Sequence, residues 1–90
     1  MPAMAADIYI ERKYEIHIDG QIKPGDAEKI ASLLGKMTAV SSFFVNSNGG
    51  NVGESMKIAS LIEGVHATFR VKKGGVCASA CFLMLVAAQH

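Results

Sequence analysis

The chain has 90 residues, which is enough for one small domain whose core has little margin of stability. Its formal net charge of +1 argues against an electrostatic surface for binding nucleic acid. Half of the residues are hydrophobic, a high fraction for a free-standing small domain, so we expect an apolar surface covered by a partner, by another copy of the chain or by further sequence.

Neither end of the chain predicts export or membrane insertion. Residues 1–6 are small and apolar and are expected to be disordered; they lack the basic start and the long apolar run of a secretory signal. The longest apolar run, residues 76–88, is too short to span a bilayer and indicates a buried helix. The sequence as written therefore predicts a cytoplasmic protein.

The first part of the chain predicts two strands and a helix. Residues 7–11 and 14–19 alternate between polar and apolar side chains, as strands do. A helix is expected to begin at residues 24–26, where Asp26 can cap free amides, and to end near Gly35.

The rest of the chain predicts strands that alternate with helices. Residues 42–46 contain the continuous apolar run Phe43-Phe44-Val45, which is typical of a strand buried on both faces in a parallel sheet. A helix over residues 52–63, a strand over 67–71 and a helix over 78–88 follow. This order predicts one α/β domain with right-handed crossovers.

Two cysteines, Cys77 and Cys81, stand four residues apart. They amount neither to a disulfide framework nor to a zinc site with four ligands. If both lie on the helix, the geometry does not favour a bridge between them, so we expect two small buried side chains beside Ser79. No metal ion and no cofactor is predicted.

Two turns carry the chemical signal. Gly49-Gly50 follows one predicted strand, and Ser79 follows the next, between small side chains at the start of a helix. Ligands of open α/β sheets bind beyond the carboxyl ends of the strands, so we expect Ser79 within about 5 Å of the glycine turn. The N–H groups of Gly50 and Ala80 could then bind an oxyanion, which contributes roughly 3–4 kcal/mol in favourable cases. Together the turns predict acyl-transfer chemistry, although singly they could be an ordinary helix cap and an ordinary turn.

A base for Ser79 is harder to find among the three histidines. His90 lies about 16 Å further along a continuous helix, and His66 is expected at the opposite edge of the sheet. His17, two residues from Asp19 on the same strand face, is the best-placed candidate base, with an ordinary surface histidine as the alternative. Because an unassisted hydroxyl is a poor nucleophile, this polypeptide alone is not expected to be a competent hydrolase.

Three segments resemble the proteolytic subunit of the Clp peptidase family. Residues 45–56 resemble its strand–Gly-Gly–helix signature, although the family usually has proline where Asn48 stands. Residues 75–85 are similar to its nucleophile segment, and residues 18–22 resemble its first strand and turn. The resemblance covers roughly residues 14–90. The serine flanked by cysteines is most similar to an uncharacterised bacterial branch of Clp-like proteins, many of them predicted to be periplasmic.

The resemblance implies a Clp/crotonase-like spiral of β-β-α units with a mostly parallel sheet, of which this chain would be the N-terminal half. Ser79 would be the nucleophile, Gly50 and Ala80 would form the oxyanion hole, and Asn48 and Gly49 would lie in the turn that faces the substrate. The family's catalytic histidine and acidic residue come later in the chain than the serine-bearing helix. The implied partners are a peptide or protein substrate and further copies of the chain; an ATPase partner stays open.

Two functions of other classes remain open. In the first, the domain is a non-catalytic oligomerising interaction module, whose apolar last helix is covered by another copy and whose Ser79 is only a cap. In the second, it is an acyl-CoA site of the related crotonase type, which uses the same oxyanion hole without a serine nucleophile. The sequence Ala78-Ser79-Ala80 favours the peptidase, because the crotonase chemistry does not require that serine.

Overall fold

The computed structural model describes residues 6–88. This part of the chain forms four strands and three helices, in the order β1 (Asp7–Glu11), β2 (Glu15–Asp19), α1 (Asp26–Lys36), β3 (Ser42–Asn46), α2 (Val52–Gly64), β4 (Thr68–Val71) and α3 (Ala80–Ala88). The first three elements make one β-β-α unit, and two β-α units follow. The expected α/β class is confirmed.

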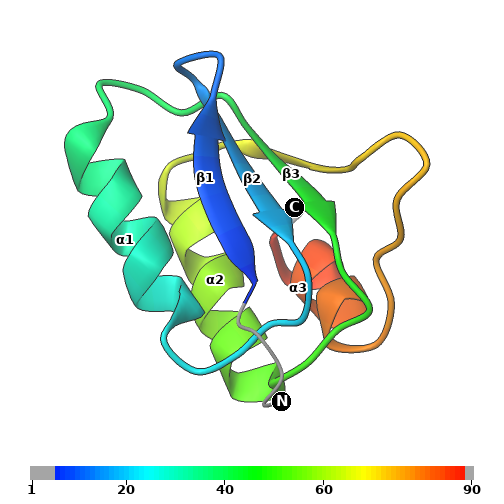
Figure 1. Ribbon diagram of the computed structural model, residues 1–90. Helices are drawn as coiled ribbons and strands as arrows, with labels where there is room; N and C mark the ends of the chain where they lie inside the picture. Colours follow the sequence, from blue (N-terminus) through cyan, green and yellow to red (C-terminus); the bar gives the residue numbers. More distant parts are fainter. Residues whose placement is uncertain (1–5, 89–90) are drawn as a thin grey trace.

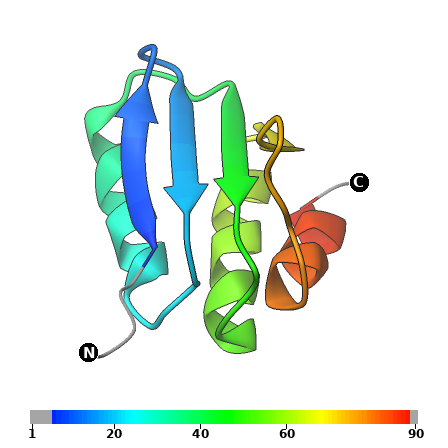
Figure 2. The same cartoon turned by 45° about the vertical axis from the view of Figure 1, so that its right-hand side comes forward.

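One sheet with the strand order β1-β2-β3-β4 organises the domain. β1 is antiparallel to β2, whereas β2, β3 and β4 are parallel, so the mostly parallel sheet is confirmed as well. The three helices lie on the same face of the sheet (Figure 1), and Figure 2 shows α1 and α2 behind the strands, with α3 beyond β3 on the right. No helix within residues 6–88 is long and apolar enough to cross a membrane.

The core lies between the sheet and the helices. Alternate residues of the strands face it, and the register places Ile16 opposite Phe43 and Phe43 opposite Phe69 in one row across three strands. From the helices, Ile58 and Met84 are fully buried in the same cluster. The alternation of β2 buries Ile16 and Ile18 against the helices, as predicted. The prediction that β3 is buried on both faces is wrong: Phe43 is fully buried, whereas Phe44 is only half-buried, because no helix within residues 6–88 covers its face of the sheet.

The start of α1 differs from the prediction. Its N-cap is Gly25, which has a φ of 98° and no side chain that could cap the helix. Asp26 is fully buried and accepts hydrogen bonds from the amides of Lys23 (2.8 Å) and Ala6 (3.4 Å), so it fixes the approach to the helix instead. Ala6 is buried although it was expected to belong to a disordered start; residues 1–5 lie outside the described part of the chain.

The start of α3 also differs, and this difference matters for the site. The helix begins at Ala80 and not at residue 78. Ser79 has a φ of 52°, in the left-handed region, so it cannot belong to the first turn of a right-handed helix. Cys77 pairs with Ser47 in a parallel β-bridge, which keeps the preceding segment extended.

Candidate active site

The two turns that the sequence singled out lie against each other. A Cβ atom added to Gly49 would lie 2.9 Å from Ser79 Cβ and 3.1 Å from the amide nitrogen of Ala80. The prediction that Ser79 adjoins the glycine turn is thus confirmed. The approach requires a glycine, because a side chain at position 49 would displace Ser79.

Ser47 joins the two turns, and the sequence analysis missed it. This buried residue donates its amide to the carbonyl of Val76 (2.8 Å) and accepts the amide of Ala78 at its own carbonyl (3.1 Å). Its hydroxyl accepts the amide of Gly49 (3.0 Å). A serine two residues before a glycine, directly after a buried strand, was the available signal, since serine hydroxyls commonly fix such turns.

Gly50 is fixed from the other side by Ile22. The two residues form a parallel β-bridge, in which the amide of Ile22 donates to Gly49 O (2.8 Å) and the amide of Asn51 donates to Ile22 O (3.0 Å). A Cβ on Gly50 would lie 2.1 Å from Ile22 O, and the φ of Gly50 is 138°. Only glycine fits this position.

Two backbone amides at the site are free to donate. Within the described part of the chain, the N–H groups of Gly50 and Ala80 have no protein acceptor. Ala80 opens α3, so its amide belongs to the set that has no intrahelical partner and lies at the positive end of the helix dipole. These are the two donors that the sequence predicts for an oxyanion.

The Ser79 side chain is exposed, and its hydroxyl has no hydrogen-bond partner among residues 6–88. It borders a shallow, mostly apolar hollow of about 670 Å³. The hollow is lined by Val52, Cys77, Ala78, Ser79, Ala80, Phe82 and Leu83. A substrate can therefore reach the hydroxyl, and apolar groups would occupy the space beside it.

Cys77 and Cys81 form a disulfide, with their Cα atoms 5.1 Å apart. The prediction of two unbridged side chains is wrong, because it rested on the supposition that both cysteines lie on one helix. Only Cys81 lies on α3, whereas Cys77 belongs to the extended segment that pairs with Ser47, and the turn between them brings the sulfurs together. Cys81 is fully buried and Cys77 half-buried.

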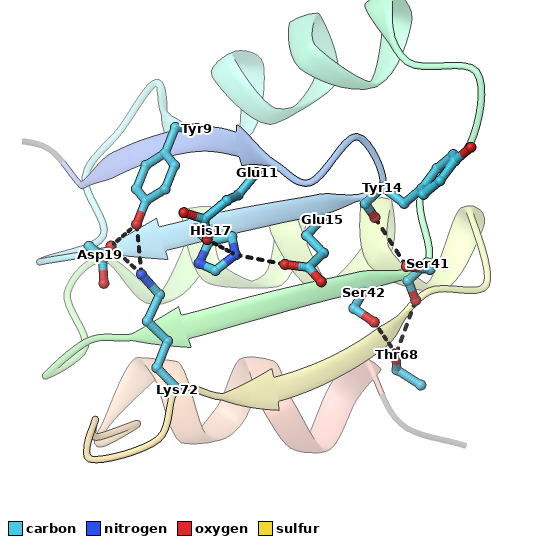
Figure 3. Close-up of polar contacts among 10 residues, drawn as sticks. All are labelled: Tyr9, Glu11, Tyr14, Glu15, His17, Asp19, Ser41, Ser42, Thr68 and Lys72. Atoms are coloured by element: carbon cyan, nitrogen blue, oxygen red, sulfur yellow. Dashed lines mark hydrogen bonds and ion pairs between the residues drawn. The ribbon is translucent and has the colours of Figure 1, made fainter.

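His17 lies on the face of the sheet that carries no helix within the described residues (Figure 3). It is buried between the rings of Tyr9 and Phe44, whose centroids lie 5.2 and 5.0 Å from its own. Its Nε2 atom lies 3.1 Å from Glu11 and 3.2 Å from Glu15. The imidazole therefore pairs with two glutamates, and no contact joins it to Ser79 or to Asp19.

The same three residues are the one group within residues 6–88 that could hold a metal ion. Glu11, Glu15 and His17 offer ligand atoms that all lie within 4.8 Å of one another. The two ion pairs to His17 already account for their closeness. The group lies across the sheet from α3, so it has no part in the chemistry of Ser79 (Figure 3).

Asp19 belongs to a second polar cluster on this face (Figure 3). Lys72 Nζ donates to Asp19 Oδ2 (2.6 Å) and to the hydroxyl of Tyr9 (2.8 Å), which itself donates to Asp19 (2.9 Å). Partial burial opposes ionisation of both groups, but these hydrogen bonds outweigh it. They lower the pKa of Asp19 below its ordinary value of 3.8 and raise the pKa of Lys72 above 10.5. The cluster ties the end of β2 to β1 and to the residue after β4.

The other histidines offer no closer base. His66 precedes β4 and shares a hollow with Glu63 and Ala88, at the end of the sheet opposite to the glycine turn, as predicted. His90 lies outside the described residues. The structure thus brings Ser79, Gly49 and the two free amides together, and it places His17 and His66 elsewhere.

An exposed serine beside a glycine turn, with unpaired amides at the carboxyl ends of parallel strands, is typical of α/β serine hydrolases. The family model of the Clp protease matches residues 4–90, and the chain therefore belongs to the Clp protease family. The resemblance of its motifs to this family is confirmed. No curated protein and no solved structure gives a significant match.

Proposed function

We propose that Ser79 is the nucleophile of a peptidase and attacks the carbonyl carbon of a peptide bond to form an acyl-enzyme. The amides of Gly50 and Ala80 stabilise the oxyanion of the tetrahedral intermediate. The observation that carries the proposal is the contact between the two turns, where an added Gly49 Cβ would lie 2.9 Å from Ser79 Cβ. Asn48 is exposed on the same turn, in a place where it can contact the peptide.

No base for Ser79 lies beside it within residues 6–88. His17 is engaged with Glu11 and Glu15, and we do not assign it a role at Ser79. Residues 6–88 thus supply a nucleophile and oxyanion donors, and without a base the serine stays a hydroxyl of ordinary reactivity. We infer that this polypeptide alone does not turn over peptides.

A peptide boronic acid tests the site without requiring a base in the protein, because its boron accepts the serine oxygen while the hydroxyl proton passes to the buffer. The boron then carries a negative charge like that of the intermediate. We expect the adduct to shift the amide NMR signals of Gly50 and Ala80, and Ser79→Ala to abolish the shifts. Unchanged signals at millimolar inhibitor would defeat the proposal. Acyl-CoA binding that survives Ser79→Ala would favour the crotonase chemistry instead.

A fluorophosphonate probe tests the absence of a base. Such probes label serines that are activated by a neighbouring base. We expect Ser79 of this polypeptide to label no faster than the exposed Ser60, with Ser79→Ala as the blank. Rapid labelling of Ser79 would show that a base operates within the chain.

A second function, self-association, is favoured by the outer surface of α3. Phe82, Leu83 and Val86 are 55%, 48% and 57% exposed on a helix that has no polar face. Exposed apolar clusters of this kind mark interaction sites. We propose that other copies of the chain cover them, and that sedimentation shows concentration-dependent association that Phe82→Ser weakens.

The disulfide favours an oxidising compartment over the cytoplasm that the sequence alone predicted, because cytosolic thiols are kept reduced. We propose that the chain works in such a compartment, the periplasm being the one predicted for many of its Clp-like relatives. Alkylation of free thiols during cell lysis tests this: Cys77 and Cys81 should be protected. Complete alkylation would place the protein in a reducing compartment.

A further inference from the structure

The disulfide encloses the proposed nucleophile, and its two ends belong to different parts of the fold. Cys77 is held by its bridge to Ser47 beyond the end of β3, and Cys81 is fully buried in the core at the start of α3. Residues 78–80, with Ser79 in the middle, form the short loop that the sulfur link closes.

Ser79 adopts a backbone conformation that needs support. Its φ of 52° lies in the left-handed region, which is unfavourable for a residue with a Cβ and persists where the surroundings determine it. Inside the loop, the amide of Cys81 donates to Ala78 O (3.0 Å). From outside, Gly49 contacts Ser79, and the disulfide is the one covalent constraint that spans both sides of the serine.

The position of the link argues against a general role in stability. A disulfide stabilises a fold by restricting the unfolded chain, and this effect is smallest when the bridged residues are close in sequence. Cys77 and Cys81 are four residues apart. The benefit of this link is therefore local, and Ser79 lies at its centre.

We propose that the Cys77–Cys81 disulfide positions Ser79: it holds the serine in the left-handed conformation against Gly49, with the hydroxyl presented to substrate, and reduction releases it. The inference rests on the proposed function of Ser79 as nucleophile. It adds a positioning group to that site and makes the geometry of the nucleophile dependent on redox conditions.

Reduction by dithiothreitol follows ordinary thiol–disulfide exchange. A reagent thiolate attacks the sulfur of Cys77, the less buried of the two residues, and the Cys81 thiolate leaves and takes up a proton. The second reagent thiol then displaces Cys77 as a thiol and closes the cyclic oxidised reagent. Two electrons and two protons pass from the reagent to the protein.

Amide hydrogen exchange and backbone couplings, measured by NMR on the oxidised and reduced 90-residue chain, test the proposal. On reduction we expect the amides of Cys81 and Leu83, which donate to Ala78 O and Ser79 O, to exchange about tenfold faster. Ser79 should lose its positive φ, while the amides of β2 and β3 change less than about twofold. Ser79→Ala should respond as the wild type does. Ser79→Gly should respond less, because glycine accepts a positive φ without the support of the disulfide.

Cys77→Ala, which leaves the buried Cys81 in place, must reproduce the effect of reduction. The proposal is overturned if Ser79 keeps its positive φ and the amide of Cys81 keeps its slow exchange in the reduced protein and in this variant. It is equally overturned if the whole sheet opens together with the loop, since the disulfide would then stabilise the whole domain and not the loop alone.

The boronic acid titration separates this proposal from the proposed function. At least a tenfold loss of affinity on reduction, with an unchanged sheet, supports both. If the oxidised protein forms no adduct, the assignment of Ser79 as nucleophile fails. If the loop still loosens on reduction in that case, the effect of the disulfide on the backbone of Ser79 is supported by itself.

Discussion

Gly49→Ala isolates the contact on which the site depends. At this position φ is 113°, and an added Cβ would lie 2.9 Å from both Ala78 O and Ser79 Cβ. We expect two costs. The backbone angle costs about 1–3 kcal/mol for a residue with a side chain, and forcing a methyl group into a packed contact costs about 1–3 kcal/mol more.

Two other glycines separate these costs. Gly25 has a φ of 98° but no atom within 4 Å of an added Cβ, so Gly25→Ala should show the backbone cost alone, about 1–3 kcal/mol. Gly64 lies at the end of α2, with an ordinary φ and no neighbour within 4 Å. Gly64→Ala should be neutral or stabilise the protein by about 0.5–1 kcal/mol.

Urea unfolding of the three variants gives the free energies, and amide NMR spectra locate the change. Gly49→Ala should be the least stable, and it should shift the Ser79 and Ala80 signals, whereas Gly25→Ala should leave those signals in place. If Gly49→Ala costs no more than Gly25→Ala, then Ser79 does not press against the glycine turn. Both the proposed oxyanion site and the proposed role of the disulfide would then lose their structural basis.

The remaining predictions concern the disulfide and two carboxylates. Replacing Cys77 and Cys81 together by alanine should cost about 2 kcal/mol in urea unfolding, the value for closing so short a loop; a loss above about 4 kcal/mol would mean that the link supports the whole core. Glu54→Ala should cost about 1.5–3 kcal/mol, because its buried carboxylate accepts an amide of the first turn of α1 at 2.7 Å; a neutral outcome by the same measurement would contradict that contact. Because the pKa of Asp19 is lowered in the folded protein, its contribution to stability is present above pH 3.8 and is lost as the pH falls through the folded pKa. Between pH 6 and pH 3 the wild type should therefore lose up to about 1 kcal/mol more stability than Asp19→Asn, and equal losses would show that the cluster is not formed.

Most of the fold could be predicted, because polar and apolar side chains alternate with a regular period in strands and in amphipathic helices. The alternation of residues 15–19 and the apolar run of residues 43–45 located β2 and β3, and the predicted helix over 52–63 ends one residue before α2 does. The two turns could be placed together for the same reason, since parallel strands bring their carboxyl ends to one edge.

The start of α3 could not be predicted, because residues 76–88 are apolar on every side, so no alternation of polar and apolar residues marks the first residue of the helix. The structure sets this start through contacts with a segment thirty residues earlier. The bridge from Ser47 keeps Cys77 extended, and the glycine turn admits Ser79 in its left-handed conformation. The disulfide follows from that turn, so an error of two residues at the start of the helix hid the covalent bond beside the proposed nucleophile.

Buried polar residues were the other failure, and the cause is similar. His17 alternates with isoleucines in the manner of a solvent-facing residue, and it becomes buried because Tyr9 and Phe44 flank it from the neighbouring strands. Asp26 resembles an N-cap, but it is fully buried and accepts the amide of Ala6, the residue directly before β1. A single sequence shows its own periodicity but not its neighbours across the sheet.

The parts of the site differ in how they are held, and this difference bears on catalysis. Gly50 is held by Ile22, and Ser79 lies between Gly49 and the disulfide, so the proposed oxyanion donors and the proposed nucleophile are fixed by contacts within the described residues. Preorganised donors cost no reorganisation when charge develops, which is why they can act on a substrate carbonyl as soon as it is bound. If Ser79 is the nucleophile as proposed, a base has to reach its exposed side, and an imidazole within about 3 Å of that hydroxyl would complete the proposed site without any change in the rest of it.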